Sequence, residues 1–403
     1  MDPIFITGAG VVSAIGVGKK ETLSSLLSGQ TGIGKMRYLK SLHIDIPVGE
    51  VKLTNEEMAH LLGVDNNPQF TRTALIGRLA LREALEEASL DGDNLDDVHF
   101  ISATTVGGMD RREMYHSQEK GCDSFVAEIA THNCAASSEM IAEQFGNFAS
   151  ISTVSTACSS ATNAIITGAN MLRCGMADIV VAGGSESLSK FHLNGFNSLM
   201  ILDHNQCRPF DKDRAGLNLG EGAAYLVMET ATSVKKRGVS PLCILSGYGN
   251  ACDAFHQTAS SPDGKGAFLA MKKALELAKK KPEDIQYINA HGTGTINNDE
   301  SESYAIKRVF DNKTPPISST KSFTGHTTSA SGSIEAVFCF LALKEQFLPV
   351  NINWKTPMEN GIIPVMNPTP VSEIKNILSN AFGFGGNDSS LIFSRIESFY
   401  ENK

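Results

Sequence analysis

The sequence shows no excess of positive charge, no long apolar run and no paired-cysteine motif. Its 44 Asp and Glu residues outnumber its 35 Lys and Arg residues, which gives a net charge of −9 at pH 7. A nucleic-acid-binding protein normally carries a basic excess, so this balance argues against a nucleic-acid partner. It still allows a local basic patch for an acidic protein. No stretch reaches the roughly 18 to 20 consecutive apolar residues of a membrane span, so we expect no membrane contact.

The cysteines and the N-terminus favour the cytoplasm. None of the eight cysteines forms a C-x-x-C pair, and a chain of 403 residues can bury a sizeable core without disulfides. We therefore predict reduced thiols, as is usual in the cytosol. The chain passes from Met1 into an apolar segment at residues 4–6 without the basic segment or cleavage site of a signal peptide. We expect a cytoplasmic protein.

Short apolar runs alternate with helical patterns along the chain. Residues 73–88 and 266–280 carry apolar side chains at helical spacing. Continuously apolar runs, which predict strands covered on both faces, occupy residues 4–7, 100–103, 179–182, 223–228, 285–289 and 391–394. The alternation of the two patterns predicts a layered α/β fold.

No proline- or serine-rich linker divides the chain. The best boundary lies near residues 230–250, where a charged region precedes a new apolar run. Each part contains a strand followed by a polar turn rich in glycine, serine and threonine. We therefore expect two similar units packed together, residues 1–240 and residues 241–403.

Cys158 is the candidate nucleophile. An apolar run with Ile151 and Val154 leads into small residues, and a helix-compatible stretch follows through Leu172. The cysteine would lie at a strand-to-helix turn, where unpaired N–H groups and the helix dipole favour the reactive thiolate. Most free cysteines are simply small buried apolar residues, as Cys339 in its apolar run is expected to be. Cys158 differs from them through its surroundings and its partners.

Two histidines stand in polar turns after apolar runs. His291 begins the sequence HGTGT, and His326 ends TKSFTGH, with Lys321 five residues earlier. One imidazole can hydrogen-bond a developing oxyanion while another moves a proton. A cysteine with two histidines fits thioester exchange followed by carbanion attack, and equally a cysteine hydrolase. The histidine spacing fits no common zinc site, so we expect no metal.

The local motifs resemble those of the β-ketoacyl-carrier-protein synthases of fatty-acid and polyketide assembly, the condensing branch of the thiolase-like fold. The resemblance covers essentially the whole chain, and an ordered set of motifs is more specific than any one glycine motif. It implies a five-layered α-β-α-β-α fold of two similar halves, normally a homodimer, with a heterodimer as the alternative. Four segments match in order: TACSS at 156–160, HGTGT at 291–295, TKSFTGH at 320–326 and FGFGG at 382–386.

The resemblance implies a mechanism for a 3-oxoacyl-carrier-protein synthase of fatty-acid biosynthesis. Cys158 would accept an acyl chain from a phosphopantetheine thioester, and its own N–H with that of Phe384 would form the oxyanion hole. A malonyl-carrier thioester would then lose carbon dioxide while His291 and His326 hold its carbonyl oxygen. The enolate would attack the acyl-cysteine and extend the chain by two carbons.

Other matching residues have implied supporting roles. Lys321 would orient the polar network together with Glu335, and Phe384 would also gate access to the cysteine. Thr293 and Thr295 would bind the pantetheine arm. No cofactor would be bound permanently, because the phosphopantetheine arm arrives on the acyl carrier protein.

The sequence departs from the family pattern at three places. Asn387 and Asp388 stand where members commonly have Thr-Asn, and residues 214–220 read RAGLNLG instead of the more usual RDGFVxG. Met200 falls where some elongating enzymes have an arginine for the carrier protein. None of these changes removes a catalytic group. They leave open a type II ketosynthase of polyketide or aryl-polyene assembly.

Three other protein classes fit the residues less well. A biosynthetic thiolase would need a second cysteine near its C-terminal glycine motif, and residues 384–388 contain none. A papain-like hydrolase would leave residues 321–326 unexplained. A chain-length factor, the inactive partner in some synthase heterodimers, lacks the nucleophile that Cys158 supplies.

An acidic carrier protein requires a locally basic entrance on this acidic chain. The candidates for such a patch are Arg72, Arg78, Arg111 and Arg112. For any one of them, a solvated surface charge without a partner is the simpler interpretation.

Overall fold

The computed structural model describes residues 2–64, 70–116, 131–311, 313–367, 369–370 and 373–397. Its main strands in the first half of the chain are β1 (Ile4–Ser13), β3 (Val98–Ala103), β4 (Ser150–Val154), β5 (Ile179–Glu186) and β6 (Gly222–Thr230). Those of the second half are β7 (Cys243–Cys252), β8 (Tyr287–Asn289), β9 (Ile317–Ser318), β12 (Asn376–Gly383) and β13 (Asn387–Ser394). Three short strands are β2 (Gly16–Val17), β10 (Phe347–Leu348) and β11 (Thr369–Pro370).

Helices occupy most of the intervening chain. Those of the first half are α1 (Lys19–Ser28), α2 (Asn55–Leu62), α3 (Arg72–Glu87), α4 (Met109–His116), α6 (Cys134–Ala142), α7 (Ser160–Arg173), α8 (Lys190–Ser198) and α9 (Ala231–Arg237). Those of the second half are α10 (Lys265–Ala278), α11 (Ile296–Val309), α12 (Lys321–Thr324) and α13 (Ser331–Glu345). Short 3-10 turns are η1 (Gly92–Asn94), η2 (Pro282–Asp284) and η3 (Thr328–Ala330). None of the helices within the described ranges is both long enough and apolar enough to cross a bilayer.

The two halves repeat one strand plan. The first half has the order β4-β3-β5-β6-β1, and the second half has the corresponding order β9-β8-β12-β13-β7. In both, the first three strands pair in parallel, and the fourth strand pairs antiparallel with the third and with the fifth. The sheets join where residues 4–6 of β1 pair with residues 243–245 of β7. The similarity of the two units follows from this shared order.

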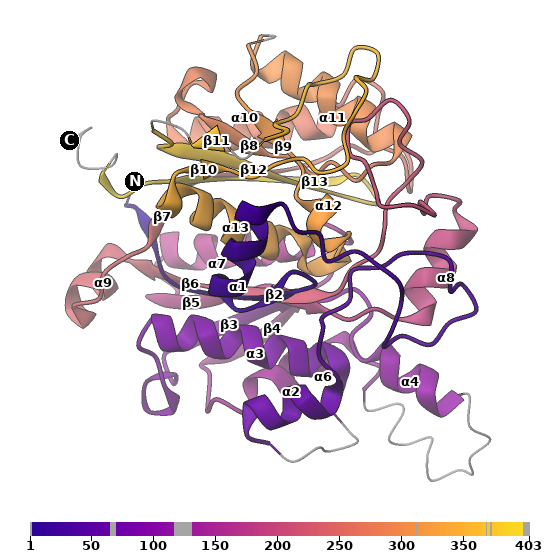
Figure 1. Cartoon of the computed structure of the whole chain (residues 1–403). Coiled ribbons are helices and arrows are strands. Elements are labelled where there is room, and N and C mark those ends of the chain that lie inside the picture. Colours follow the sequence, from indigo (N-terminus) through magenta and orange to yellow (C-terminus); the bar gives the residue numbers. More distant parts are fainter. Residues whose placement is uncertain are drawn as a thin grey trace.

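Helices and sheets form five layers (Figure 1). Helices α2, α3 and α6 cover the outer face of the first sheet, and α10 and α11 cover the outer face of the second. Helices α7 and α13 lie between the sheets and contact both of them. Helix α13 is buried on every side through Leu343, which explains why its sequence shows no polar face. The predicted five-layered α/β fold is confirmed.

Equivalent glycines let the outer helices approach the strands closely. A Cβ atom at Gly10 of β1 would lie 2.0 Å from the Ala80 carbonyl oxygen of α3. A Cβ atom at Gly249 of β7 would lie 2.2 Å from the Ala270 carbonyl oxygen of α10. The same contact therefore fixes the helix-to-sheet spacing in both halves. It also explains why β1 continues to Ser13 instead of ending at the predicted residue 7, because its glycines belong to the strand and not to a turn.

Candidate active site

The candidate residues follow the carboxyl ends of parallel strands. Cys158 comes after β4, His291 after β8, and Lys321 and His326 after β9. Phe384 comes after β12, which is parallel to β8. Carboxyl ends of parallel strands meet at one edge of a sheet, and loops from that edge commonly build ligand sites. The strand plan thus gathers residues that lie far apart in the sequence.

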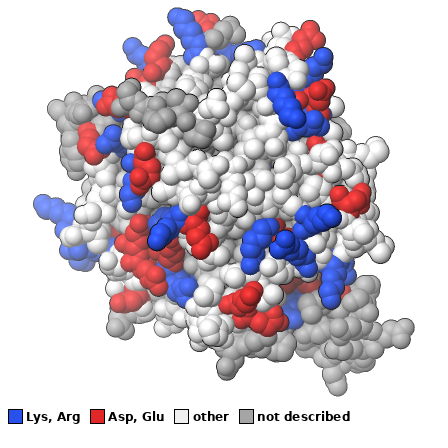
Figure 2. Space-filling model, in the orientation of Figure 1, with Lys and Arg blue, Asp and Glu red and all other residues white. Residues whose placement is uncertain are grey.

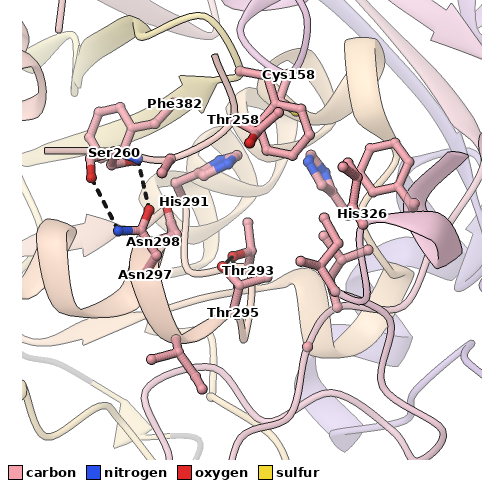
Figure 3. Close-up of a pocket in the computed structure, with 18 of the residues that line it drawn as sticks. Cys158, Thr258, Ser260, His291, Thr293, Thr295, Asn297, Asn298, His326 and Phe382 are labelled. Carbon is pink, nitrogen blue, oxygen red and sulfur yellow. Dashed lines mark hydrogen bonds between the residues drawn. The ribbon is translucent and has the colours of Figure 1, made fainter. Parts of the chain in front are cut away.

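These loops enclose a pocket of about 340 Å³. Its lining includes Cys158, both histidines, Thr293, Thr295 and Phe384. The imidazole rings of His291 and His326 point toward one another across this space (Figure 3). Their ring centroids are 5.3 Å apart, and the rings are nearly perpendicular. The structure therefore brings the predicted nucleophile and both predicted imidazoles to one site.

Cys158 lies in a strained turn directly before α7. The preceding residue, Ala157, has a left-handed φ of 53°, and Ser159 is the N-cap residue of the helix. Burial raises the pKa of the Cys158 thiol to about 11, although Lys321 and the backbone N–H groups of Phe384 and Cys158 itself act in the opposite direction. The backbone N–H group at the helix start acts in the expected direction, but desolvation outweighs it, so the pKa of the thiol is raised in the free protein.

Both histidines are held neutral. Burial, and then the positive charge of Lys321, lower the pKa of His291 and of His326 well below the ordinary value for histidine. His326 Nδ1 is hydrogen-bonded to Ser331 Oγ at 2.9 Å. His291 Nδ1 is buried and has no hydrogen-bond partner among the residues that the structure describes. Each neutral ring carries one N–H group, so the pair can donate hydrogen bonds to an oxyanion without delivering full positive charge.

Lys321 forms a buried ion pair behind the histidines. Its Nζ atom lies 2.6 Å from Glu335 Oε1, and both side chains are almost completely buried. Burial raises the pKa of Glu335 to about 7 even though Lys321 lowers it. The other carboxylate oxygen, Oε2, accepts no hydrogen bond from the described part of the chain. The lysine thus adds positive potential at the site. Its partner Glu335 can lose its negative charge easily, because the pKa of this carboxyl group is raised.

Both halves of the chain match domains of one protein family. Residues 1–233 match the β-ketoacyl synthase N-terminal domain, and residues 242–355 match the β-ketoacyl synthase C-terminal domain. The chain belongs to the β-ketoacyl synthase family. This confirms the predicted family and the predicted class of enzyme, an acyltransferase that condenses acyl groups.

Relatives of this synthase resemble it over nearly their full length. It is 34% identical to the 3-oxoacyl-[acyl-carrier-protein] synthase 2 of Staphylococcus aureus strain N315, over 98% of this chain and 99% of that one. Among solved structures, it resembles the ishigamide ketosynthase/chain length factor with a TM-score of 0.90 and 28% identity, covering 98% and 99% of the two chains. It also resembles a Xenorhabdus doucetiae ketosynthase in complex with its chain length factor, with a TM-score of 0.84 and 29% identity over 98% of both chains.

Two threonines and a phenylalanine border the pocket of the synthase. Thr293 and Thr295 are hydrogen-bonded to each other through their hydroxyl groups at 2.8 Å, so they present one polar strip. Phe384 is half-buried, and its ring stacks on Phe196 of α8 with centroids 5.8 Å apart. Phe384 therefore lines the same pocket as Cys158 and Phe196 and is not part of the buried core.

Two acidic residues of α11 hold the turn of His291, and the sequence analysis missed both. Glu302 accepts hydrogen bonds from the backbone N–H groups of His291 and Gly292 at 2.9 and 2.7 Å. Asp299 accepts from the backbone of Gly294 at 3.2 Å. Both carboxylates are buried. Acidic residues three apart on a helix that directly follows a glycine-rich turn are the signal that would have identified them.

The proposed carrier-protein patch is largely wrong, because Arg72 belongs to the interior of the synthase. Its side chain is 8% exposed, and its Nη2 atom lies 2.6 Å from Glu221 Oε1. The same guanidinium donates hydrogen bonds to the backbone carbonyls of Val51 and Leu53. A cation enclosed in this way stabilises the fold and cannot meet a partner protein.

Arg78 and Arg111 are also buried, and only Arg112 is exposed. Arg78 is 2% exposed and lies over the ring of Phe70, whose carbonyl oxygen accepts a hydrogen bond from Arg111. On the face shown in Figure 2, Lys and Arg are mostly interspersed with Asp and Glu, apart from a small basic group right of the centre. The positions of the four arginines in the sequence did not predict which of their side chains are exposed.

Proposed function

We propose that this synthase is a 3-oxoacyl-[acyl-carrier-protein] synthase that joins an acyl group on Cys158 to a malonyl unit. The observation that carries the proposal is the convergence of Cys158, His291 and His326 on one pocket from three remote loops. The geometry suits two successive reactions, because the thiol and the imidazole pair face the same space but come from different halves of the fold.

In the first reaction, Cys158 Sγ attacks the carbonyl carbon of an acyl thioester. The new C–S bond forms as the bond to the pantetheine sulfur breaks, and the cysteine proton leaves with the pantetheine thiol. The backbone N–H groups of Cys158 and Phe384, both of which act on this sulfur, stabilise the tetrahedral oxyanion. Positive potential from Lys321 favours loss of the proton from a thiol whose pKa burial has raised.

In the second reaction, a malonyl thioester loses carbon dioxide. The C–C bond to the carboxylate breaks, and its electron pair forms an enolate whose oxygen accepts hydrogen bonds from the neutral rings of His291 and His326. The enolate carbon attacks the acyl-cysteine carbonyl, and the C–Sγ bond breaks to release a chain longer by two carbons. Cys158 leaves as the thiolate and takes a proton from water.

The substrates reach the site on a carrier protein. Thr293 and Thr295 line the pocket and offer hydroxyl groups to the amides of a phosphopantetheine arm, which arrives with the carrier instead of remaining bound as a cofactor. Phe384 gates the way to Cys158. Arg112 remains the one exposed member of the predicted patch. The curated relative in Staphylococcus aureus is named for an acyl-carrier-protein substrate, which supports this partner.

An open sheet edge supports a dimer. Among the described strands, β4 pairs only with β3 and ends the strand order of the first half, and Ile151 on it is 41% exposed. An unpaired strand with an exposed apolar side chain is suited to pairing with a second strand. We assign a homodimer, with a heterodimer as the alternative. Sedimentation of the wild type and of Ile151→Lys tests the assignment, since a monomeric wild type would contradict it.

A ketosynthase of type II polyketide or aryl-polyene assembly is the second candidate function. It is favoured by the structural likeness to the ishigamide and Xenorhabdus doucetiae ketosynthases, each described together with a chain length factor. A chain-length-factor role for this chain itself is disfavoured by the presence of Cys158. The seven described cysteines are all free thiols, which supports the cytoplasm as the place of reaction.

The decisive experiment combines acyl transfer with substrate choice. Purified protein is incubated with cerulenin, a thiol-directed inhibitor of condensing enzymes, and analysed by mass spectrometry. Mass should appear on Cys158, and protein without it would contradict the catalytic role. Malonyl-carrier protein with a panel of saturated and polyunsaturated acyl-carrier proteins then distinguishes fatty-acid synthesis from polyene assembly.

A further inference from the structure

A cluster of amide and hydroxyl side chains lies beside the nucleophile turn and outside the pocket lining. Its members come from both halves of the fold: Ser159 and Asn163 from the start of α7, Asn250 from β7, and Asn387 and Ser389 from β13. None of them lines the pocket. The cluster therefore has no direct contact with a substrate in that pocket, and the reaction described above does not use it.

Asn387 is the acceptor at the centre of this cluster. Its Oδ1 atom receives hydrogen bonds from Ser159 Oγ at 2.9 Å, from Asn163 Nδ2 at 2.7 Å and from Asn250 Nδ2 at 2.9 Å. Two of these donors belong to the segment that carries Cys158. One side-chain oxygen thus ties β13 of the second half to the helix start of the first half.

Asn163 extends the connection to the other side of the nucleophile. Its Nδ2 atom also donates to Thr156 Oγ1 at 2.8 Å, and its Oδ1 atom accepts from Ser389 Oγ at 2.7 Å. Thr156 precedes the left-handed Ala157. The residues on both sides of Cys158 are therefore attached to the same strand, β13.

Asn387 also closes the turn that presents Phe384. Gly383 and Asn387 are paired across β12 and β13, so Phe384, Gly385 and Gly386 form a three-residue turn. The turn packs closely on the nucleophile segment, since a Cβ atom at Gly383 would lie 2.9 Å from the Thr156 carbonyl oxygen. A displacement of Asn387 would be transmitted to the Phe384 N–H, because only a tight turn separates them.

We propose that Asn387 is a positioning residue that keeps the N–H groups of Phe384 and Cys158 aligned as one oxyanion hole. These two donors come from different halves of the fold, and no strand pairing joins β12 or β13 to β4. Asn387 supplies a direct polar connection between them. The inference rests on the proposed acyl transfer to Cys158 and adds a residue to it.

The expected effect follows from the geometry of oxyanion stabilisation. Loss of a whole oxyanion-hole donor costs about 10²- to 10³-fold in rate, and a displacement near 1 Å costs on the order of 10²-fold. Asn387→Ala leaves the donors present but less well aligned. We expect transfer of a hexanoyl group from hexanoyl-carrier protein to Cys158 to slow by about 10- to 100-fold.

Two reactions of the same protein provide internal controls. Alkylation of Cys158 by iodoacetamide forms no oxyanion, so its rate in Asn387→Ala should fall much less than the rate of acyl transfer, with only a small loss because the same N–H groups also act on the sulfur. Release of carbon dioxide from malonyl-carrier protein depends on His291 and His326 and should change equally little. A fall of all three rates together would show general damage to the site and would overturn the proposal, as would unchanged acyl transfer.

Matched variants separate the acceptor oxygen from the shape of the side chain. Asn387→Asp keeps Oδ1 and should retain most of the acyl transfer, whereas Asn387→Leu has a similar size, lacks the acceptor and should behave as Asn387→Ala. Asn250→Ala removes one donor but leaves both links to the nucleophile segment, so it should have little effect. Equal rates for the Asp and Leu variants would contradict the proposal.

A further variant covers the case in which changes at Asn387 prevent folding. Ser159→Ala removes one of the links from the nucleophile side and should slow acyl transfer more than alkylation. Wild-type protein that is alkylated on Cys158 but never acylated would instead contradict the proposed function itself. The two failures are therefore distinguishable.

Discussion

The antiparallel strand pairs β5–β6 and β12–β13 occupy equivalent places in the two halves, yet their connections differ greatly. Between β12 and β13 the chain needs only Phe384, Gly385 and Gly386. Between β5 and β6 it runs through residues 187–221, which include α8 with Phe196, and Met200 beyond it. Both connections reach the pocket, where Phe196 stacks on Phe384.

The difference shows how one scaffold serves two purposes. The short turn fixes the backbone N–H group of Phe384 near Cys158. An oxyanion donor must be placed accurately, and a short turn allows little variation. The long connection builds a wall of the pocket, and Met200 on it is 88% exposed. Such a wall can vary with the substrate while the strand plan beneath it stays the same. The repeated strand order thus determines the fold, and the loops between the strands carry the reactive residues.

The largest expected effect tests the division of chemistry between the halves. Cys158→Ala should lower condensation by at least about 10³-fold but keep release of carbon dioxide from malonyl-carrier protein. His291→Ala should keep acylation of Cys158 but lower carbon dioxide release by about 10²- to 10³-fold, because an oxyanion donor is lost. Rapid-quench assays of both half-reactions measure this. If either change removed both half-reactions equally, the chemistry would not be divided in this way.

A buried ion pair in each half gives the second test. Arg72→Met strands Glu221 and should lower the free energy of unfolding by about 3–5 kcal/mol. Lys321→Met should cost less, about 1–3 kcal/mol, because the pKa of Glu335 is already raised to about 7 and the acid can become neutral. Only the lysine change should abolish condensation at temperatures where the protein remains folded. Urea denaturation measures the stability difference, and the reverse ranking would contradict it.

The glycine contacts of β1 and β7 test whether the helix-to-sheet packing contributes equally to stability in the two halves. A Cβ atom at Gly10 or Gly249 would clash with a helix carbonyl at almost the same distance. Gly10→Ala and Gly249→Ala should each cost about 3 kcal/mol and agree within about 1 kcal/mol. Gly195→Ala in α8 is the control, since nothing lies within 4 Å of its Cβ position and alanine favours helices. Unequal losses at the two contacts would show that one half stabilises the protein more than the other.

The smallest effect concerns Asp388, which directly follows Asn387 at the start of β13. Burial, and then the charges of Asp253 and Glu302, raise the pKa of Asp388 to about 8. From about pH 4 to about pH 8 the folded state therefore holds a proton that the unfolded state has released, so stability falls as pH rises. Asp388→Asn should be more stable than the wild type by about 2 kcal/mol at pH 8, with a smaller gain at lower pH.

Denaturation of both proteins from pH 5 to pH 8 measures this gain. A gain that did not shrink toward acidic pH would show that Asp388 does not titrate in the folded protein. The half-reaction rates at the same pH values show whether the turn that carries Phe384 is affected as well.

The sequence predicted the parts of this molecule that depend on local pattern. The alternating runs gave the strands and the layered fold, and the order of the motifs identified Cys158, His291, Lys321 and His326 as a group. The structure places the first, second and last of these in one pocket. Such residues were identifiable because glycine, serine and threonine around a reactive side chain are unusual in a structural core.

Other features depend on burial, which single-sequence patterns do not determine. Arginine is usually a surface residue, but the Arg72 side chain is enclosed by Glu221 and backbone carbonyls. The pKa of Cys158 depends on how far water is excluded from it, and that effect exceeds the contribution of the helix start. Glu302 lies on the helix that follows the glycine-rich turn of His291, but which acidic residue of that helix accepts the backbone hydrogen bonds depends on how α11 packs against the turn.

The glycine–alanine contacts also bear on how this protein can change over evolutionary time. Where main-chain atoms touch main-chain atoms, the separation of a helix from its sheet is set by the peptide units, which are the same in every protein. Large core side chains can then be exchanged without altering the thickness of a layer. The loops that carry the reactive groups then keep their positions relative to one another. New substrate preferences can therefore arise without changes to the sheets and helices that position the catalytic residues.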